Sequence, residues 1–512
     1  MADEGTCVGK RVVCDGSRGT VKYFGEVPPT AGEWFGVEWD DENRGKHDGT
    51  LDGVSYFTCS HPKNGSFVRL KKVEFGVSVV DALRLKYGDD VQKHIQDLHV
   101  VGIKQKTEVE MVGAETVWKV QSCFEKLTDI SLSNQNVRGP DKDLPLHSFA
   151  PMFLSLIKNQ LDIINLDLSG NLLCSWEDVA EVVHNLTNLK MLNVSNNRLT
   201  MPSDISSLKP SFCYVKELFL NKMKMSWEEI SAAVRMFPNL ENLHVCYNSI
   251  YSLRVNNSHD CSDLLSCYQN IVLLDLYGNN LTDWDEILDL GVLSRLSTLI
   301  LANNKFSEVR FDNSQGPQST MNFSSVKSLN LSENQIKDIS SINALNMLPL
   351  LEELRVKDNP VFEGLTSFAS RQELIARISS LQIVNGSPVT GRERKAAEQA
   401  YIKKFAKDWL FAGGKCEDCD SNKLDGEFLI MHPRYLELLK AHGAPDTGSI
   451  NKTSTTLKDS LIALTFKCPN DSSKKVITKK LPGTMTIGKV KGLLYRLYKV
   501  DSADQTLSYL DT

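Results

Sequence analysis

The 512-residue sequence has no strong charge of either sign and no long apolar run. Its formal net charge is only -6, and it lacks the basic stripe that marks proteins that bind nucleic acid. No apolar stretch approaches the roughly 20 residues that a membrane-spanning helix needs. The sequence therefore predicts a protein that binds neither nucleic acid nor membrane.

Catalytic signatures are missing as well. The sequence contains no G-x-x-x-x-G-K-[ST] phosphate loop, no H-E-x-x-H metal motif and no G-x-S-x-G nucleophile elbow. Its 12 cysteines have no framework spacing, and the polar, acidic start "MADEGTCVGK" is not typical of an export signal. We therefore expect reduced thiols in the cytoplasm, no enzymatic activity, no bound cofactor and no metal site.

Residues 1–80 read as a small domain of short strands broken by turns. The segments "RVVC", "GTVKYFGEV", "WFGVEWD", "SYFTC" and "SFVRL" are rich in β-branched and aromatic residues, which favours strands. Strict alternation along strands would bury only about half of these aromatic side chains. The remainder would form an exposed apolar patch, which is typical of a binding site.

The segment "RGKHDGTLDG" places three polar residues between two glycines. Gly45 and Gly49 can adopt positive φ, and without a Cβ they let another backbone approach closely. Lys46 supplies a cation, while His47 and Asp48 supply hydrogen-bonding groups beside the aromatic residues. This combination suits an extended peptide with acidic residues, an aromatic side chain and a free carboxylate. A solvated hairpin turn is the alternative interpretation.

The stretch from "GTVKYFGEV" to "GSFVR" resembles the CAP-Gly family, the glycine-rich module of microtubule-associated proteins. That family carries a Gly-Lys-Asn-Asp-Gly signature and binds the Glu-Glu-Tyr/Phe tails of α-tubulin and its mimics. Here His47 replaces the asparagine, and its imidazole still donates one hydrogen bond but titrates near neutral pH. The resemblance implies an all-β, SH3-like barrel that holds the tail with Phe24, Trp34, Trp39, Gly45, Lys46, His47, Asp48, Gly49, Phe67 and Arg69.

A repeat occupies residues 121–395, beyond a connecting segment at 81–120. The pattern L-x-x-L-x-L-x-x-N-x-L, with apolar substitutes, recurs nine times from "LTDISLSNQNV" to "LEELRVKDNPV". This spacing is typical of leucine-rich repeats, whose leucines share one core and whose asparagine amides bond neighbouring backbone. One repeat cannot bury its own apolar face, whereas nine stacked repeats can. We therefore expect an α/β solenoid, with its asparagine ladder interrupted at Gln135 and Met223.

Helices are expected between the strands of the array. The segments "SWEDVAEVV", "SWEEISAAV" and "DWDEILDLG" read as helix starts on the convex side, capped by Ser175, Ser226 and Asp283. Their tryptophans are expected to pack in the core. The segment "LQIVNGSPVTGRERKAAEQAYIKKFAKDWL" resembles the cap that closes such arrays and predicts a charged helix from about Gly391.

The concave face of the array is set by strand positions that alternate with the buried leucines. These positions are polar in the early repeats and polar or charged at the end. In the middle repeats they are Phe219, His244, Leu273, Tyr277 and Ile300. We predict a protein-binding patch that contains Phe219, His244, Tyr277 and Ile300. Partial cover by the long loop at 251–269 is the alternative.

The rest of the sequence divides into a helix with a linker (396–455) and a small α+β domain (456–512). Cys416 and Cys419 form a lone C-x-x-C pair in the linker, which is read as free thiols because no second pair lies nearby. "LIALTFKCP" and "KKVITKKLP" predict a hairpin, "TMTIGKVKGLLYRLYKV" a helix capped by Thr484 or Thr486, and "QTLSYLDT" a further strand. The order β-β-α-β resembles a ubiquitin-like domain that is truncated.

The succession of CAP-Gly module, leucine-rich repeats and ubiquitin-like segment resembles the tubulin-folding cofactor E family over nearly the whole chain. The resemblance implies a protein of the cytoplasm and cytoskeleton that binds α-tubulin. With cofactors B, C and D it would assemble and dissociate the αβ-tubulin heterodimer, and it could also contact the proteasome. Two alternatives are a microtubule-associated adaptor for acidic-aromatic tails and a ubiquitin- or proteasome-linked adaptor.

Overall fold

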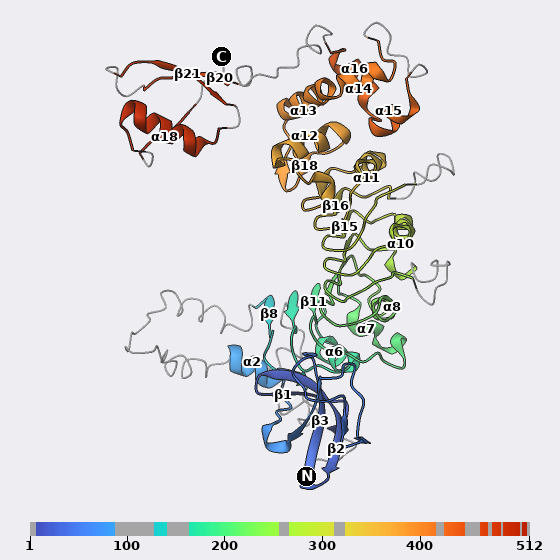
Figure 1. Ribbon diagram of the computed structural model, residues 1–512. Coiled ribbons are helices and arrows are strands. Elements are labelled where there is room, and N and C mark those ends of the chain that lie inside the picture. The colour runs from blue at the N-terminus through green and yellow to red at the C-terminus, as the bar shows by residue number, and fades with distance from the viewer. Residues whose placement is uncertain are drawn as a thin grey trace. The chain divides into compact units, whose positions relative to one another are not determined.

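The computed structural model describes residues 7–87, 127–140, 163–254, 266–311, 323–415, 424–445, 461–468, 474–482, 485–501 and 504–508 (Figure 1). The chain divides into two compact units. The first comprises Met1–Glu398 with Leu429–Arg434, and the second comprises Gln399–Phe428 with Tyr435–Thr512. Each unit is described by itself.

A small antiparallel β-sheet opens the first unit. Its order is β1-β2-β3-β6, formed by β1 (Arg11–Cys14), β2 (Ser17–Val27), β3 (Thr30–Trp39) and β6 (Gly65–Arg69), and a short pair joins β4 (Thr50–Leu51) to β5 (Val54–Ser55). The predicted strand "SYFTC" is wrong in its last four residues, because the backbone leaves the strand conformation after Ser55. The sheet buries an apolar core of its own, separate from the core of the repeats.

The repeats form a long, mainly parallel sheet, as predicted. Nine successive parallel strands match the nine predicted repeats, and β18 and the antiparallel β19 extend the same sheet. In order these strands are β8 (Asp129–Ser131), β10 (Asn165–Asp167), β11 (Met191–Asn193), β12 (Glu217–Phe219), β13 (Asn242–His244), β14 (Leu273–Asp275), β15 (Thr298–Ile300), β16 (Ser328–Asn330), β17 (Glu353–Arg355), β18 (Ile383–Val384) and β19 (Ser387–Pro388).

The asparagine ladder of the repeats is confirmed. The buried Asn279 side chain accepts from the backbone N–H of Asn248 and Ile250 at 3.0 and 3.1 Å, and it donates to the carbonyls of Val245 and Leu276. Each such amide satisfies backbone groups of two neighbouring repeats where the chain leaves the strand. Met223 breaks the series and instead lies buried in the core.

Helices and short helical turns follow the strands. The three predicted caps are confirmed, because the side chains of Ser175, Ser226 and Asp283 each accept a hydrogen bond from a backbone N–H in the first turn. The elements are α6 (Trp176–Val183), η3 (Ile205–Leu208), α7 (Lys209–Phe212), α8 (Trp227–Val234), η4 (Ser266–Tyr268), α10 (Trp284–Asp289), η5 (Leu290–Val292), α11 (Ile339–Ala344), η7 (Leu345–Met347), η8 (Pro360–Phe362) and α12 (Ser367–Arg377). Trp176, Trp227 and Trp284 are buried, as predicted.

The segment that follows the β-sheet closes the front of the array. The 3-10 turn η1 (Leu70–Lys72) leads to β7 (Val77–Ser78), which pairs in parallel with β9 (Val137–Gly139), and α2 (Val79–Tyr87) follows. The buried side chains of α2 belong to the same apolar core as the repeat leucines. The Tyr87 hydroxyl also bonds the backbone of Ser131 in β8. The sequence pattern places residues 1–80 in the module and 81–120 in a connecting segment, and it does not predict β7 or α2.

The end of the array is closed by α13 (Gly391–Lys404), the predicted charged helix, whose Ala397 is buried against the repeat core. The second unit contains α14 (Ala406–Phe411) and α16 (Tyr435–His442), while α13 and α15 (Gly426–Met431) each have residues in both units. Within the second unit the buried Tyr435 hydroxyl donates to the carbonyl of Ile402 at 2.8 Å. Cys416 and Cys419 lie outside the described residues.

The last described elements are the antiparallel strands β20 (Leu461–Phe466) and β21 (Ile477–Pro482) and the helix α18 (Ile487–Tyr498). The hairpin and helix are as predicted, and Thr486 is the N-cap residue, although its side chain makes no cap hydrogen bond. The predicted third strand is wrong for residues 504–508, which are not in strand conformation. Among the helices of the described ranges, none is long and apolar enough to cross a membrane.

Candidate binding surfaces

An aromatic cluster covers one side of the β-sheet of the N-terminal module. Phe67 on β6 is its centre, with Tyr56 and Phe57 at centroid distances of 5.3 and 5.5 Å in edge-to-face geometry. Tyr23 on β2 packs edge-to-face on Tyr56 at 5.3 Å. Phe67, Tyr56 and Tyr23 are all partly exposed. The cluster is therefore the exposed aromatic patch that the strand pattern predicted. Tyr23 and Tyr56 are partly exposed members that the predicted site omitted, whereas Phe57 is only 8% exposed.

His47 lies against this cluster. Its ring is 5.0 Å from the Phe67 centroid at an angle of 34°, and its Nδ1 accepts a hydrogen bond from the Gly49 N–H at 3.0 Å. Burial lowers the pKa of His47, which favours the neutral ring. Because Nδ1 is an acceptor, the proton of the neutral ring is on Nε2. The ring therefore presents an N–H donor, as the asparagine of the family signature does.

The loop around His47 is fixed by backbone contacts. Lys46 N–H donates to the Gly65 carbonyl at 2.7 Å, and Gly65 N–H donates to the His47 carbonyl at 2.8 Å. Gly49 has φ of +101°, and a Cβ at this position would lie 2.0 Å from the Phe57 carbonyl oxygen. The Lys46 side chain is exposed. This turn is therefore an ordered element that presents an exposed cation beside the aromatic cluster.

Trp34 and Arg69 are cross-strand partners on β3 and β6. The Arg69 guanidinium carbon lies 3.7 Å from the Trp34 ring centroid, and the Trp34 Nε1 donates to Thr30. Two other residues of the predicted site are placed differently. Phe24 and Trp39 are only 5% and 1% exposed, and both belong to the core of the β-sheet. We therefore remove Phe24 and Trp39 from the binding set.

The predicted patch on the concave face is exposed as the alternation required. In β12–β15 the central leucine of each strand is buried, and the residues on either side are partly exposed. The Phe219 and His244 rings are stacked, with centroids 4.1 Å apart and an interplanar angle of 3°. His244 also contacts two carboxylates, Asp275 through Nδ1 and Glu217 through Nε2, each at 3.2 Å. Ile300 continues the row on β15.

Two tyrosines extend this patch to the ends of the strands. Tyr247, which sequence analysis did not select, is 45% exposed and packs edge-to-face on Tyr277 at 5.3 Å. A hydrogen bond with Tyr247 raises the pKa of Tyr277. The neighbouring Tyr251 is 80% exposed. Most of the loop at 251–269, which was the alternative cover for the patch, lies outside the described residues.

Comparisons with known proteins find one matching family model and relatives that are similar over nearly the whole chain. Residues 8–73 match the family model of the CAP-Gly domain. Over 98% of its length the chain is 40% identical to "Tubulin-specific chaperone E" of Xenopus laevis and 33% identical to "Tubulin-folding cofactor E" of Arabidopsis thaliana, and it covers 91% of each. A solved structure, "Bik1 CAP-Gly domain with ETF peptide from Bim1", is 36% identical to this chain over the aligned part. The alignment covers 13% of this chain and 78% of the solved chain, with a TM-score of 0.12.

Proposed function

The chain belongs to the tubulin-specific chaperone E family, and we propose that it binds α-tubulin and takes part in assembly and dissociation of the αβ-tubulin heterodimer. Tubulin-folding cofactors B, C and D would act with it, in the cytoplasm and at the cytoskeleton. The observation that carries the proposal is similarity over 98% of the chain to relatives named as tubulin chaperones. The proposed role is binding and remodelling of a protein, not catalysis.

In this proposal the N-terminal module holds the tail of α-tubulin. The exposed rings of Tyr23, Tyr56 and Phe67 offer an apolar seat for the terminal aromatic side chain. Lys46 would pair with the acidic residues, since a charge-assisted hydrogen bond to a carboxylate is about twice as strong as a neutral one. The Nε2–H of His47 would donate to the peptide.

The concave face would hold the folded body of the same molecule. Its middle strands combine stacked aromatic rings with the carboxylates of Glu217 and Asp275, so the face is neither purely apolar nor purely charged. Aromatic side chains in such mixed settings dominate the binding energy of many interfaces. Phe219, His244, Tyr247, Tyr277 and Ile300 are therefore the proposed contact residues.

Two linked sites on one polypeptide explain how a short tail contact can raise the overall affinity for α-tubulin. Once the tail is bound, the body of α-tubulin is held at a high effective concentration near the array, and overall affinity exceeds that of either site. Binding at both places would favour a state of α-tubulin whose β partner is released. Dissociation of the heterodimer would then be driven by differential binding to its two states.

For the C-terminal segment we propose a ubiquitin-like domain. The antiparallel β20–β21 pair followed by α18, with Leu481, Val490 and Leu494 buried together, fits the first half of that fold. Contact with the proteasome through this domain would be an addition to the chaperone role. A pull-down of proteasomes that is unchanged when residues 456–512 are deleted would exclude it.

The proposed function is tested with intact αβ-tubulin and with tubulin from which the α-tubulin tail has been removed. The wild-type chain should bind intact tubulin more tightly, and Lys46→Ala should remove most of that difference without changing affinity for the tail-less form. Equal affinity for both forms would contradict the role of the module. Co-sedimentation with microtubules, compared with gel filtration with soluble tubulin, separates this function from that of a lattice-bound adaptor.

A further inference from the structure

The N-terminal module and the repeat array are joined by a very short connection inside the first unit. Glu74 is still part of the module, because it exchanges two backbone hydrogen bonds with Val13, at 2.8 and 2.9 Å. Val77 is already part of the array, because its N–H donates to the Asn136 carbonyl at 3.0 Å. Only two residues therefore separate the last bond to the module from the first bond to the array.

Neither of these two residues is free to act as a hinge. The Phe75 ring packs against Phe35 of the module at 5.6 Å, in edge-to-face geometry. Gly76 has φ of +75°, and a Cβ added there would lie 2.0 Å from the Asn136 carbonyl oxygen and 2.8 Å from a Leu172 methyl group. The connection is thus fixed by packing on both sides.

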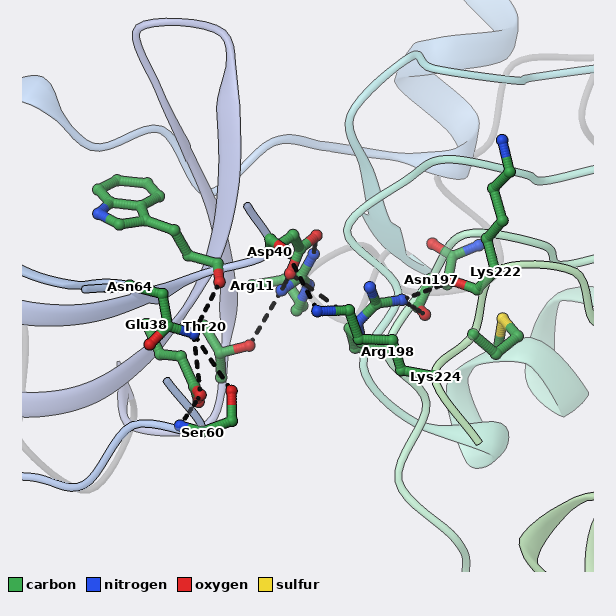
Figure 2. Close-up of polar contacts among 12 residues, drawn as sticks. Arg11, Thr20, Glu38, Asp40, Ser60, Asn64, Asn197, Arg198, Lys222 and Lys224 are labelled. Atoms are coloured by element: carbon green, nitrogen blue, oxygen red, sulfur yellow. Dashed lines mark hydrogen bonds and ion pairs between the residues drawn. The ribbon is translucent and has the colours of Figure 1, made fainter. Parts of the chain in front are cut away.

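Charged contacts join the two parts at a second place (Figure 2). Asp40, at the end of β3, is bound by the buried guanidinium of Arg11 within the module. From the array, Arg198 approaches the same carboxylate, with its Nε 3.9 Å from the Asp40 Oδ1. Arg198 is itself held in place by donating to the carbonyls of Asn197 and Lys222. Asp40 is therefore shared by cations of both parts.

Two more contacts widen this junction. Lys224 of the array lies 3.0 Å from the Glu42 carboxylate of the module, and this contact lowers the pKa of Glu42. Arg18 of the module donates to the Asn134 side chain of the first repeat at 2.6 Å. The contacts come from three different repeats, so they resist rotation about the short connection.

Residues of the junction stand close in sequence to both candidate binding surfaces. On the module side, Glu42 is followed four residues later by Lys46 of the tail-binding turn. On the array side, Lys224 follows the strand that carries Phe219, and Lys222 extends its ammonium to 5.3 Å from the Tyr247 ring centroid. Residues of the junction are thus within a few positions of both surfaces.

We propose that this junction fixes the module and the array as one body, so that the aromatic cluster of the module and the concave face together form a single composite surface for one tubulin molecule. The proposal rests on the proposed function for the identity of the partner. A preset arrangement removes the ordering penalty that a flexible tether would add on binding. Asp40, Glu42, Arg198 and Lys224 act here as positioning residues, since none needs to touch the partner.

The first test inserts a flexible Gly-Ser segment of about six residues between Phe75 and Gly76 of the full chain. Affinity for a peptide ending in Glu-Glu-Tyr should stay within about twofold, because the aromatic cluster and the Lys46 turn are untouched. Affinity for αβ-tubulin should fall about tenfold, because the preset arrangement is lost. Unchanged tubulin affinity in a folded insertion variant would overturn the proposal.

The second test needs no tubulin and reports the junction itself. Spin labels on the module and the array should give one narrow distance distribution in the wild-type chain, and a broader one in Glu42→Lys and in Lys224→Glu. The combined Glu42→Lys/Lys224→Glu variant should restore the narrow distribution. Because exposed ion pairs are weak, each single change is expected to alter tubulin affinity only about two- to fivefold.

Lys216→Glu is the matched control for Lys224→Glu. Lys216 is also an array lysine in an exposed ion pair, 2.9 Å from Glu241, but it makes no junction contact in the described structure. Lys216→Glu should leave the distance distribution unchanged. Equal broadening in both variants, or no broadening in either, would overturn the proposal. If the wild-type chain shows the narrow distribution yet does not bind tubulin, the proposed function fails while the fixed junction stands.

Discussion

The two candidate binding surfaces of the first unit are built in different ways. The surface of the N-terminal module depends on tight backbone approaches, such as that of Gly49 to the Phe57 carbonyl, and on one cluster of rings. The concave face depends on a strand pattern that is repeated down the array. In each strand a buried central leucine anchors the backbone, and the residues on either side of it are partly exposed. The first surface is therefore sensitive to backbone changes, whereas the second tolerates changes in its exposed residues without loss of fold.

Among the single changes that test this difference between the two surfaces, Gly49→Ala should have the largest effect on stability. The added Cβ would overlap the Phe57 carbonyl and force a residue with positive φ into strain, so we expect the module to lose about 3 kcal/mol of stability. Thermal unfolding followed by tryptophan fluorescence measures the loss. Gly53→Ala is the matched control, since Gly53 has φ of +79° but open space around it, and it should lose only about 1 kcal/mol. Equal losses in both variants would show that the close approach is unimportant.

Asn279→Ala should be the most damaging single change in the repeat ladder. It leaves the backbone N–H groups of Asn248 and Ile250 without their acceptor, in a buried setting, for which we expect about 2 kcal/mol. Hydrogen exchange should show faster exchange in the neighbouring repeats but not in the N-terminal module. Uniform faster exchange through both would mean that the two parts unfold together.

Phe219→Ala should separate binding from stability. Because Phe219 is partly exposed on the concave face, the array should remain folded, while affinity for αβ-tubulin should fall about tenfold. Affinity for the tail peptide should not change. Val292→Ala, which removes an apolar side chain that is 55% exposed on a turn after α10, is the control and should bind tubulin normally.

Acidification should have the smallest effect and should act on the module. The pKa of His47 is lowered in the fold, so the unfolded chain takes up this proton first, and stability is lost as pH falls through the ordinary histidine pKa of about 6.5. Stability from this group is complete above that pH. The melting temperature of the module should drop between pH 7.5 and 5.5 by more in wild type than in His47→Asn. An equal drop would exclude His47 as the cause.

The features of the repeat array that depend on sequence periodicity could be predicted from the sequence. Repeat strands, their asparagine ladder and the helix caps at Ser175, Ser226 and Asp283 all follow from spacing and short-range hydrogen bonding, and all are confirmed. The capping role of α2 was not predicted, because this segment carries no repeat pattern and its partners lie far away in sequence. The burial of α2 against the repeat core depends on tertiary packing, which local sequence patterns do not show.

The burial of Phe24 has a local cause. The register of β2 against β3 shifts between Val21 and Tyr23, so the inward positions are Val21 and Phe24 rather than alternating residues. A β-bulge of this kind reverses the side on which later side chains lie. Trp39 is inward because it continues the alternation of Phe35 and Val37. Tyr247 was missed because it stands in the turn after its strand, with φ of +56°.

We propose that one tubulin molecule contacts the aromatic cluster of the module and the concave face together. The most direct measurement is the affinity of the full chain for αβ-tubulin, with and without a saturating peptide that ends in Glu-Glu-Tyr. We predict that the peptide weakens tubulin binding about a hundredfold and that the remaining binding depends on Phe219. Tubulin affinity that does not change in the presence of the peptide would contradict the claim.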